Sequence, residues 1–414
     1  MRNQTVAFFV NQFPKLSETF ILNQITGLID LGIDVKIIAI EEGYENKIHQ
    51  SYYDYNLAER TTYLNRRKNQ PRWKKLASRM FKLSKAALCG DFVSVRQVLN
   101  KHQPRNKLTS LYLADFLGTE NHHSHYYLII AHFGPNGYLA TQLRTLGVFL
   151  GPIATVFHGF DMSEQRILNQ YQKAYQTLFE QGDLMLPISN LWKERLISWG
   201  CNENKIRVHR MGVNLEQLPI RTPTQPLKKP LRVICIGRMT EKKGIEYAIE
   251  GVALASKYIS VELNIIGGGE LLPHVQSLII QHQAQDYIHC LGPQTHQVVK
   301  EYLDSSDVFL LPSVTAPSGD MEGIPVALME SMACGLLTLT TRHSGIPELV
   351  DDGINGFLTD ERNAQQIANK LLDISQLSQI EISAIRHSAR KTIENTFNNY
   401  ILNQELLSIC KSFG

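Results

Sequence analysis

Two glutamates stand eight positions apart in the stretch Asp320–Glu330, which reads DMEGIPVALME. Glu322 precedes a Gly-Ile-Pro turn, and Glu330 lies in the helix-like run that follows it. Pro325 suits the first turn of a helix, so we expect the helix to begin near Ile324. At about 1.5 Å of rise per residue, the two carboxylates would lie on the order of 10 Å apart. That separation suits one extended ligand held at both ends.

The first turn of this helix also offers a site for an anion. Its free backbone amides and the positive end of the helix dipole favour negative charge. Pro325 has no N–H, so we expect Ile324 and Val326 to supply the amides. The alternative is that both glutamates only favour the dipole, since acids are common near the start of a helix.

Basic residues follow a strand-like run further upstream. The run RVICIG ends at Gly237, and the motif GRMTEKKG then supplies Arg238 and Lys243. We expect these cations at the carboxyl edge of a parallel sheet, where a diphosphate could bind. A solvated basic turn is the alternative.

A glycine-rich loop follows the next strand-like run, VELNIIG. Gly267, Gly268 and Gly269 would let another molecule approach the backbone closely, and Glu270 would start the next helix. The loop is not a G-x-G-x-x-G fingerprint, and no G-x-x-x-x-G-K-[ST] loop is present, which disfavours ATP hydrolysis.

Together these groups fit a nucleotide diphosphate sugar. Glu322 would bind the sugar hydroxyls, and Glu330 would bind the ribose. Arg238, Lys243 and the helix amides would bind the diphosphate, with Gly237, Gly268 and Gly269 close to the donor.

Short apolar runs alternate with helix-length segments along the chain, a pattern that predicts parallel sheets covered by helices on both faces. The alternation breaks near Glu216, at EQLPIRTPTQPLKKP, and then restarts. We therefore expect two doubly wound α/β domains, residues 1–214 and 215–394, with ligands bound between the carboxyl ends of their sheets. The helical run 395–414 would cross back onto the first domain, or simply cap the second. The strands expected in the first domain are Val6–Val10, Val35–Ile40, Leu128–Phe133, Ile153–His158, Leu184–Ile188 and Ile206–His209.

The composition indicates a soluble globular protein, with 43% hydrophobic and 20% charged residues among 414. No apolar run approaches the roughly 18 to 20 residues that cross a bilayer, so we expect a cytoplasmic protein. Six cysteines lie far apart, and we expect them to be reduced and mostly buried. His122, His123 and His125 make a poor ligand set for a metal, and a solvated loop is the better interpretation.

Positive charge is concentrated in residues 60–107, which hold fourteen lysines or arginines and one acid, Asp91. The stretch carries +13, so the rest of the chain carries −10 against a total of +3. In RWKKLASRMFKLSKAAL the apolar residues recur at helical spacing beside the cations, which predicts a basic amphipathic helix at an anionic membrane surface. The alternative is a solvated face without a partner. Nucleic acid is disfavoured, because no binding module surrounds the stretch.

The motifs GRMTEKKG, IIGGGE and EGIPVALMESMACG, followed by TTRHSGIPELVDDGINGFL, resemble those of retaining glycosyltransferases of family four. The E-x7-E spacing from Glu322 to Glu330 matches the hallmark of that family, and the match continues in order over about 120 residues. The resemblance implies the GT-B fold, in which two Rossmann-like doubly wound domains face a central cleft. In the first half, FPKLSETFILNQ, AHFGPNG, FHGFD, PISN and HRMGV resemble a bacterial subgroup that builds exopolysaccharides such as colanic acid, or lipopolysaccharide.

The resemblance implies transfer of a hexose from a nucleotide diphosphate sugar to an acceptor, a saccharide or polyprenyl-linked saccharide, with retention at the anomeric carbon. His158 would reach the donor sugar, although a core histidine at a strand end is the alternative, and Ser17 and Glu18 would contact the acceptor. Many family members have glycine at the position of Pro325. No Asp-x-Asp pair follows a strand, so we expect no metal and no other cofactor, with Arg238 and Lys243 meeting the leaving-group charge.

Other functions stay open from the sequence. A sugar phosphorylase or a nucleotide-sugar epimerase can use the same two-domain fold. A glycan-binding protein without catalysis is a third possibility. The sequence does not name the base or sugar of the donor, the acceptor or the oligomeric state.

Overall fold

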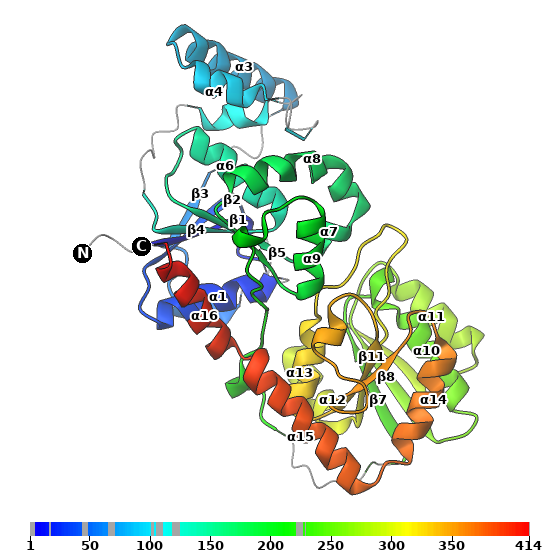
Figure 1. The fold of residues 1–414 in the computed structure, drawn as a ribbon. Coiled ribbons are helices and arrows are strands. Elements are labelled where there is room, and N and C mark those ends of the chain that lie inside the picture. Colours follow the sequence, from blue (N-terminus) through cyan, green and yellow to red (C-terminus); the bar gives the residue numbers. More distant parts are fainter. Residues whose placement is uncertain are drawn as a thin grey trace. The chain divides into compact units, whose positions relative to one another are not determined.

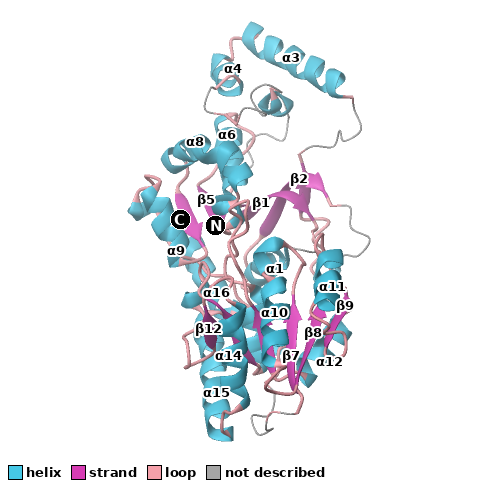
Figure 2. Cartoon of the chain, turned by 90° about the vertical axis from the view of Figure 1, so that its right-hand side faces the viewer, coloured by secondary structure: helices cyan, strands magenta, loops and turns pink. Residues whose placement is uncertain are grey.

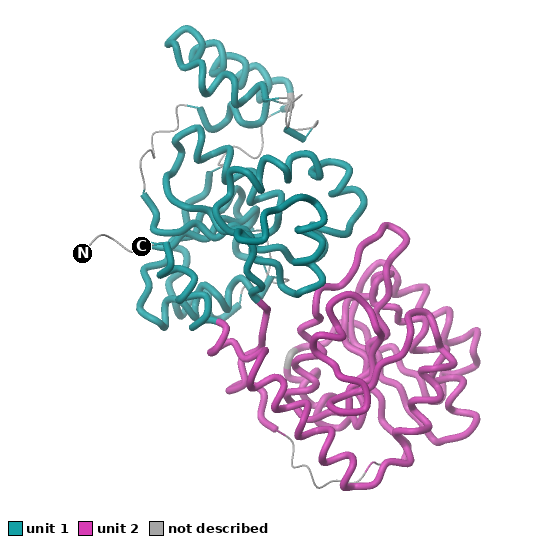
Figure 3. The backbone as a smooth tube through the Cα atoms, viewed as in Figure 1, with its two compact units in different colours: residues 1–209, 403–414 teal, residues 210–402 magenta. Residues whose placement is uncertain are grey.

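The computed structural model describes residues 5–15, 18–43, 49–64, 71–100, 103–104, 111–117, 125–220, 227 and 229–413. These residues form two compact units, shown in Figure 3. Unit 1 comprises residues 1–209 and 403–414, and unit 2 comprises residues 210–402. Residues 221–226 and 228 of the expected linker lie outside the described part of the chain.

Unit 1 contains a six-stranded parallel sheet with the order β3-β2-β1-β4-β5-β6. Helices cover both of its faces, with α1 and α16 on one and α6 and α8 on the other (Figure 1). The strands are β1 (Val6–Phe13), β2 (Val35–Glu42), β3 (Thr61–Tyr63), β4 (Leu128–His132), β5 (Ile153–Phe157) and β6 (Leu184–Pro187). The helices are α1 (Thr19–Asp30), α2 (Gln50–Asp54), α3 (Arg72–Leu88), α4 (Phe92–Val98), η2 (Tyr112–Phe116), α6 (Gly134–Thr145), α7 (Phe160–Ser163), α8 (Gln165–Gln181), α9 (Asn190–Ser198), η3 (Glu203–Lys205) and α16 (Asn399–Lys411), of which the last begins in unit 2.

Unit 2 repeats this plan, with a six-stranded parallel sheet in the order β12-β11-β10-β7-β8-β9. Figure 2 shows β7, β8 and β9 side by side. Its strands are β7 (Leu231–Ile236), β8 (Val261–Ile266), β9 (Ile288–Gly292), β10 (Val308–Leu311), β11 (Leu337–Thr341) and β12 (Phe357–Thr359). Its helices are η4 (Leu215–Gln217), η5 (Glu241–Lys243), α10 (Ile245–Ala255), α11 (Leu272–Gln281), α12 (His296–Ser305), α13 (Val326–Cys334), η6 (Ile346–Glu348), α14 (Ala364–Ser375) and α15 (Gln379–Thr396).

The strand order identifies both units as Rossmann-like. In each sheet the order reverses once, between β1 and β4 in unit 1 and between β7 and β10 in unit 2. Ligands of such sheets bind beside the carboxyl ends of the strands at this reversal. The expected pair of doubly wound α/β sheets is confirmed.

The sheets form where apolar residues run without alternation. Residues 6–10 of β1, VAFFV, are at most 2% exposed, because helices cover both faces of the sheet. One expected strand is wrong: Ile206–His209 forms only an isolated bridge, between Ile206 and Met185. This segment lies along β6 through two further backbone hydrogen bonds, and the chain then leaves the sheet. The short edge strand β3 was not predicted.

All six cysteines are unpaired, as expected, and four are buried. Among the described residues, no helix combines the length and the apolar composition that crossing a bilayer requires.

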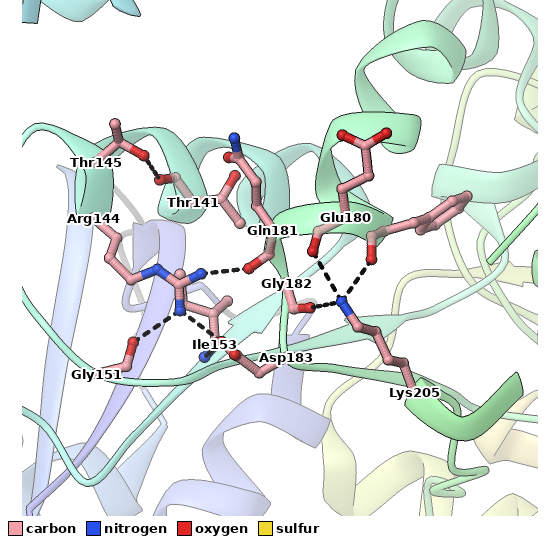
Figure 4. A network of polar contacts seen from close by, with 11 residues as sticks. Thr141, Arg144, Thr145, Gly151, Ile153, Glu180, Gln181, Gly182, Asp183 and Lys205 are labelled. Atoms are coloured by element: carbon pink, nitrogen blue, oxygen red, sulfur yellow. Dashed lines mark hydrogen bonds and ion pairs between the residues drawn. The ribbon is translucent and has the colours of Figure 1, made fainter. Parts of the chain in front are cut away.

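Two cations join the loops at the amino-terminal edge of the unit 1 sheet (Figure 4). Nζ of Lys205 donates to three carbonyls at the end of α8, those of Phe179, Glu180 and Gly182, at 2.9 to 3.0 Å. Arg144, in the last turn of α6, pairs with Asp183 at 2.6 Å. A cation in this position satisfies the carbonyls that a helix leaves without partners at its end.

We expect Lys205→Met to lower the free energy of unfolding by about 1 to 3 kcal/mol, because three carbonyls lose a charged donor. Chemical denaturation of the purified variant measures this change. Lys173→Met, on an exposed residue of α8, is the matched control and should change stability by less than about 0.5 kcal/mol. Equal stabilities of the two variants would contradict the role of Lys205.

Candidate active site

The strand reversal of unit 2 brings a buried carboxylate together with two lysines. Glu322 follows β10 and is 8% exposed, and its Oε1 atom lies 3.2 Å from Nζ of Lys243 and 3.7 Å from Nζ of Lys242. Lys242 also lies 3.0 Å from Asp320. Burial raises the pKa of Glu322, but Lys243 and Lys242 lower it more, so its pKa falls below the usual value. Glu322 is therefore ionised at neutral pH.

Arg238 and Gly237 begin the loop after β7. Arg238 is exposed, and its guanidinium has no partner among the residues that the structure describes. The side chain of Lys243 passes over Gly237, where an added Cβ would lie 3.5 Å from Cδ of the lysine. One free cation and one ion-paired cation thus border the same strand end.

The glycine loop after β8 packs against the loop after β7. Gly267 and Gly269 have φ of +145° and +151°, and a side chain on either would overlap a carbonyl oxygen, that of Gly237 or of Met239. The Met239 amide donates to the Gly268 carbonyl at 2.8 Å. At these glycines the closely packed partner is therefore the protein's own backbone, and the approach of another molecule stays a prediction. The expectation that Glu270 starts the next helix is wrong, because α11 begins at Leu272.

Helix α13 begins at Val326, with Pro325 as its N-cap residue. The expected start near Ile324 lies two residues too early, because the ψ of 126° at Pro325 is extended. Ile324 is buried ahead of the cap, whereas Val326 lies in the first turn, where amides lack an acceptor within the helix.

Glu330 lies one turn further along α13 and is partly buried. Burial raises its pKa to about 7, and its carboxylate has no hydrogen bond or ion pair with another described residue. A carboxyl group held without a partner is costly, unless a ligand supplies hydrogen-bond donors.

In unit 1, His158 follows β5 and lies against a second histidine. Its Nε2 atom is 3.0 Å from Nδ1 of His132, the last residue of β4, and the rings of Phe20 and Phe133 pack on it with centroids 4.6 and 4.5 Å away. Burial lowers the pKa of His158 to about 3, and burial together with His158 and His209 lowers that of His132 as well. Both rings are neutral at physiological pH.

Asp161 fixes the loop that carries His158. The buried carboxylate accepts the backbone amides of His158 and Gly134, at 2.9 and 2.7 Å. It therefore connects the end of β5 to the start of α6. His132 and Asp161 were not singled out from the sequence, although both lie in the motifs AHFGPNG and FHGFD.

Of the two residues assigned to the acceptor, Ser17 lies outside the described residues. Glu18 is the N-cap residue of α1 and forms an ion pair with Lys15. His122 and His123 also lie outside the described residues, and His125 is exposed. No group of three or more histidines, cysteines or acids able to hold a metal occurs within the described ranges.

We expect Glu330→Gln to stabilise the unliganded protein at alkaline pH. The folded-state pKa of Glu330 is raised to about 7 from 4.5, so its burial costs increasing free energy as the pH rises between these values. The difference in melting temperature between variant and wild type should be near zero at about pH 4.5 and should grow towards pH 8.

Thermal denaturation across this pH range measures the effect. Glu301→Gln, on an exposed glutamate of α12, serves as the control and should show no growth of the difference with pH. A constant difference for Glu330→Gln would show that its carboxyl group has an ordinary pKa.

Comparison with known proteins identifies the family. Residues 218–396 match the family model described as "Glycosyl transferases group 1". The chain is 41% identical over 408 residues to a protein of Escherichia coli (strain K12) named colanic acid biosynthesis glycosyltransferase WcaL, covering 98% of this chain and 99% of that one. It is 39% identical over 407 residues to the amylovoran biosynthesis glycosyltransferase AmsK of Erwinia amylovora, covering 98% of each.

Solved structures share the fold. A glycosyltransferase of Rickettsia africae ESF-5 superimposes with a TM-score of 0.69 at 17% identity over 99% of each chain. HepE of Anabaena, in complex with UDP, superimposes with a TM-score of 0.68 at 17% identity over 99% of this chain and 100% of that one. These likenesses confirm the expected GT-B type. The chain belongs to the group 1 glycosyl transferases, which are glycosyltransferase family four, and it is a glycosyltransferase.

Proposed function

We propose that the protein transfers a hexose from a nucleotide diphosphate sugar to a lipid-linked saccharide, with retention at the anomeric carbon, in the synthesis of a bacterial surface polysaccharide. The observation that carries this proposal is the buried Glu322 with its lysines at the strand reversal of unit 2, next to the first turn of α13 and the unpartnered Glu330. The names of the relatives WcaL and AmsK support the pathway class. They favour a transferase over the phosphorylase, epimerase and glycan-binding alternatives.

In this proposal the donor lies along unit 2. Glu330 accepts hydrogen bonds from the ribose hydroxyls, which supply the donors that its carboxylate lacks. Arg238, Lys243 and the first amides of α13, including that of Val326, bind the diphosphate. Glu322 binds hydroxyls of the sugar. HepE, which has the same fold, binds UDP, and this supports a uridine nucleotide as the first donor to test.

The reaction needs stabilisation of the charge that develops on the departing diphosphate. Preorganised cations and amides commonly provide the largest part of such catalysis, and loss of one group can cost roughly 10² to 10³ in rate. We therefore assign this role to Arg238 and Lys243 and expect no metal to be required. The acceptor hydroxyl attacks the face from which the diphosphate leaves, and the diphosphate takes up its proton. An inverted anomer in the product, detected by NMR, would contradict this mechanism.

In unit 1, neutral His158 offers hydrogen bonding to a sugar hydroxyl without adding positive charge. Its contacts with His132, Phe20 and Phe133 hold the ring in one orientation. We place the saccharide acceptor near the start of α1, at Ser17 and Glu18.

We further propose that residues 60–107 bind an anionic membrane surface at the cytoplasmic face. Helix α3 packs on η2 through its inner face, where Arg79 pairs with Asp115 and Lys82 donates to the Asp115 carbonyl. Both helices lie at the edge of unit 1 (Figures 1 and 2). Their solvent-facing sides carry large apolar side chains. The exposed fractions are 68% for Trp73, 56% for Met80, 71% for Phe81, 89% for Leu88, 70% for Phe92 and 66% for Val93.

The charge around this apolar face fits an anionic bilayer. Lys74, Lys85 and Arg96 are exposed beside it, with no acid on the same helices. Apolar side chains can enter the boundary between headgroups and acyl chains while the cations meet lipid phosphates. Residues 65–70, 101–102 and 105–110 of this part of the chain lie outside the described ranges.

We expect one nucleotide family to stabilise the protein against heat, by about 2.7 kcal/mol at 100 times its dissociation constant. A thermal-shift screen against UDP, GDP, ADP and dTDP and their sugars measures this. Glu330→Ala should abolish the shift, whereas Glu301→Ala, on the exposed face of α12, should keep it. Equal shifts for both variants would contradict the donor site.

We expect the protein to bind vesicles containing phosphatidylglycerol, and the binding to weaken with salt, since screening is effective beyond about 8 Å at physiological ionic strength. Phe81→Ser and Leu88→Ser should each weaken binding roughly tenfold or more, because each removes an inserted side chain. Cosedimentation measures both effects.

Ile380→Ser is the matched control, because Ile380 is 83% exposed on α15 of unit 2. Unchanged vesicle binding in Phe81→Ser and Leu88→Ser would contradict insertion of this apolar face into the membrane. A shift of both variants to a smaller oligomer would assign the face to a protein contact.

A further inference from the structure

A series of buried and part-buried hydrogen bonds runs from the backbone of Glu322 to the surface of unit 2. The Glu322 amide donates to Nε2 of His343 at 3.1 Å, and Nδ1 of His343 lies 2.6 Å from Oε1 of Glu361. The other carboxylate oxygen of Glu361 accepts the Thr315 amide at 2.8 Å. The series therefore joins the three loops that follow β10, β11 and β12.

The direction of these bonds fixes the protonation of the imidazole. An amide N–H can only donate, so Nε2 of His343 must be the acceptor and carry no proton. The proton of the neutral ring is then on Nδ1, where it is donated to Glu361. Proteins commonly orient a histidine in this way: a carboxylate accepts the proton of one ring nitrogen, and the other nitrogen is then free to act as an acceptor.

The imidazole at the centre of this arrangement is shielded from water. His343 is 0% exposed, and Glu361 is 24% exposed at its side chain. If His343 could not accept, the Glu322 amide would be left buried without a partner, which destabilises this conformation of the loop. The loop also contains the turn in which the Ala316 amide donates to the Asp320 carbonyl at 2.9 Å.

We propose that His343, oriented by Glu361, is a positioning residue that holds the Glu322 carboxylate against Lys243 in the geometry the transfer requires. The inference rests on the role proposed above for Glu322. His343 contacts the backbone of Glu322 and not its carboxylate, so it acts on the placement of the loop. A displacement of about 1 Å can lower a rate by about a hundredfold.

The first test is the rate of transfer. His343→Leu removes the acceptor at similar size and should lower kcat about 10- to 100-fold, whereas the thermal shift with free nucleotide should persist, since Glu330 and α13 are unaffected. His343→Gln places an amide oxygen near the Nε2 position and should recover part of kcat. Glu361→Leu should also lower kcat, because Nδ1 of His343 loses the carboxylate that holds its proton and the ring can then take the other tautomer.

A double-variant cycle separates positioning from general damage. In a Glu322→Ala background, which keeps the loop backbone, His343→Leu should cause no further loss of rate. A full additional loss in the double variant, or wild-type kcat in His343→Leu with an inactive Glu322→Ala, would overturn the proposal. Wild-type activity of Glu322→Ala would instead remove the role proposed for Glu322 itself, and the positioning role with it.

The tautomer gives a readout that does not depend on activity. Nitrogen-15 NMR of histidine-labelled protein distinguishes a proton on Nδ1 from one on Nε2, and we expect Nδ1–H for His343. Glu361→Leu should change this signal. A proton on Nε2 in the wild type would overturn the proposal, because the Glu322 amide could not then donate to that atom.

Discussion

The ion pair between Glu322 and Lys243 is the interaction on which the candidate donor site depends. Both side chains are nearly excluded from water, so removing Glu322 would leave the Lys243 ammonium without its partner in a poorly solvated place. The pair is possible because the parallel sheet of unit 2 brings the ends of β7 and β10 together at its strand reversal. Lys242 adds a second cation near the same carboxylate, and the imidazole of His343 accepts the backbone amide of Glu322. The sheet topology therefore determines the electrostatics of the site.

The sequence was sufficient for the regular elements and for the residues within short motifs. Uninterrupted apolar runs such as VAFFV in β1 and VFLL in β10 correspond to buried parallel strands, because both faces of each sheet are covered. The strand predictions that were wrong or missing lie at the two edges of the unit 1 sheet. Residues 206–209 carry too few paired backbone groups to be a strand, and β3 has only three residues, too few for a pattern.

The contacts of the site were less accessible to sequence reasoning. Glu322 meets His343 across 21 positions, His343 meets Glu361 across 18, and Asp320 meets Lys242 across 78. No local pattern reports such pairs, because they are created when loops converge at one sheet edge. The position of Pro325 in the helix was also ambiguous from the sequence, because a proline can occupy either the first turn or the N-cap position. Only the extended ψ of the folded chain distinguishes them.

Helix α16 gives the chain an unusual relation between synthesis order and structure. Unit 1 is formed mostly by residues 1–209, yet it is completed by residues 403–414, where Leu406, Ile409 and Cys410 are buried. Residues 403–414, which are synthesised after the whole of unit 2, thus complete the unit that was begun first. The same feature constrains recombination between related enzymes, whether natural or designed. A first unit exchanged as residues 1–209 alone would arrive with part of its apolar surface uncovered, so a functional chimera must carry residues 403–414 together with residues 1–209.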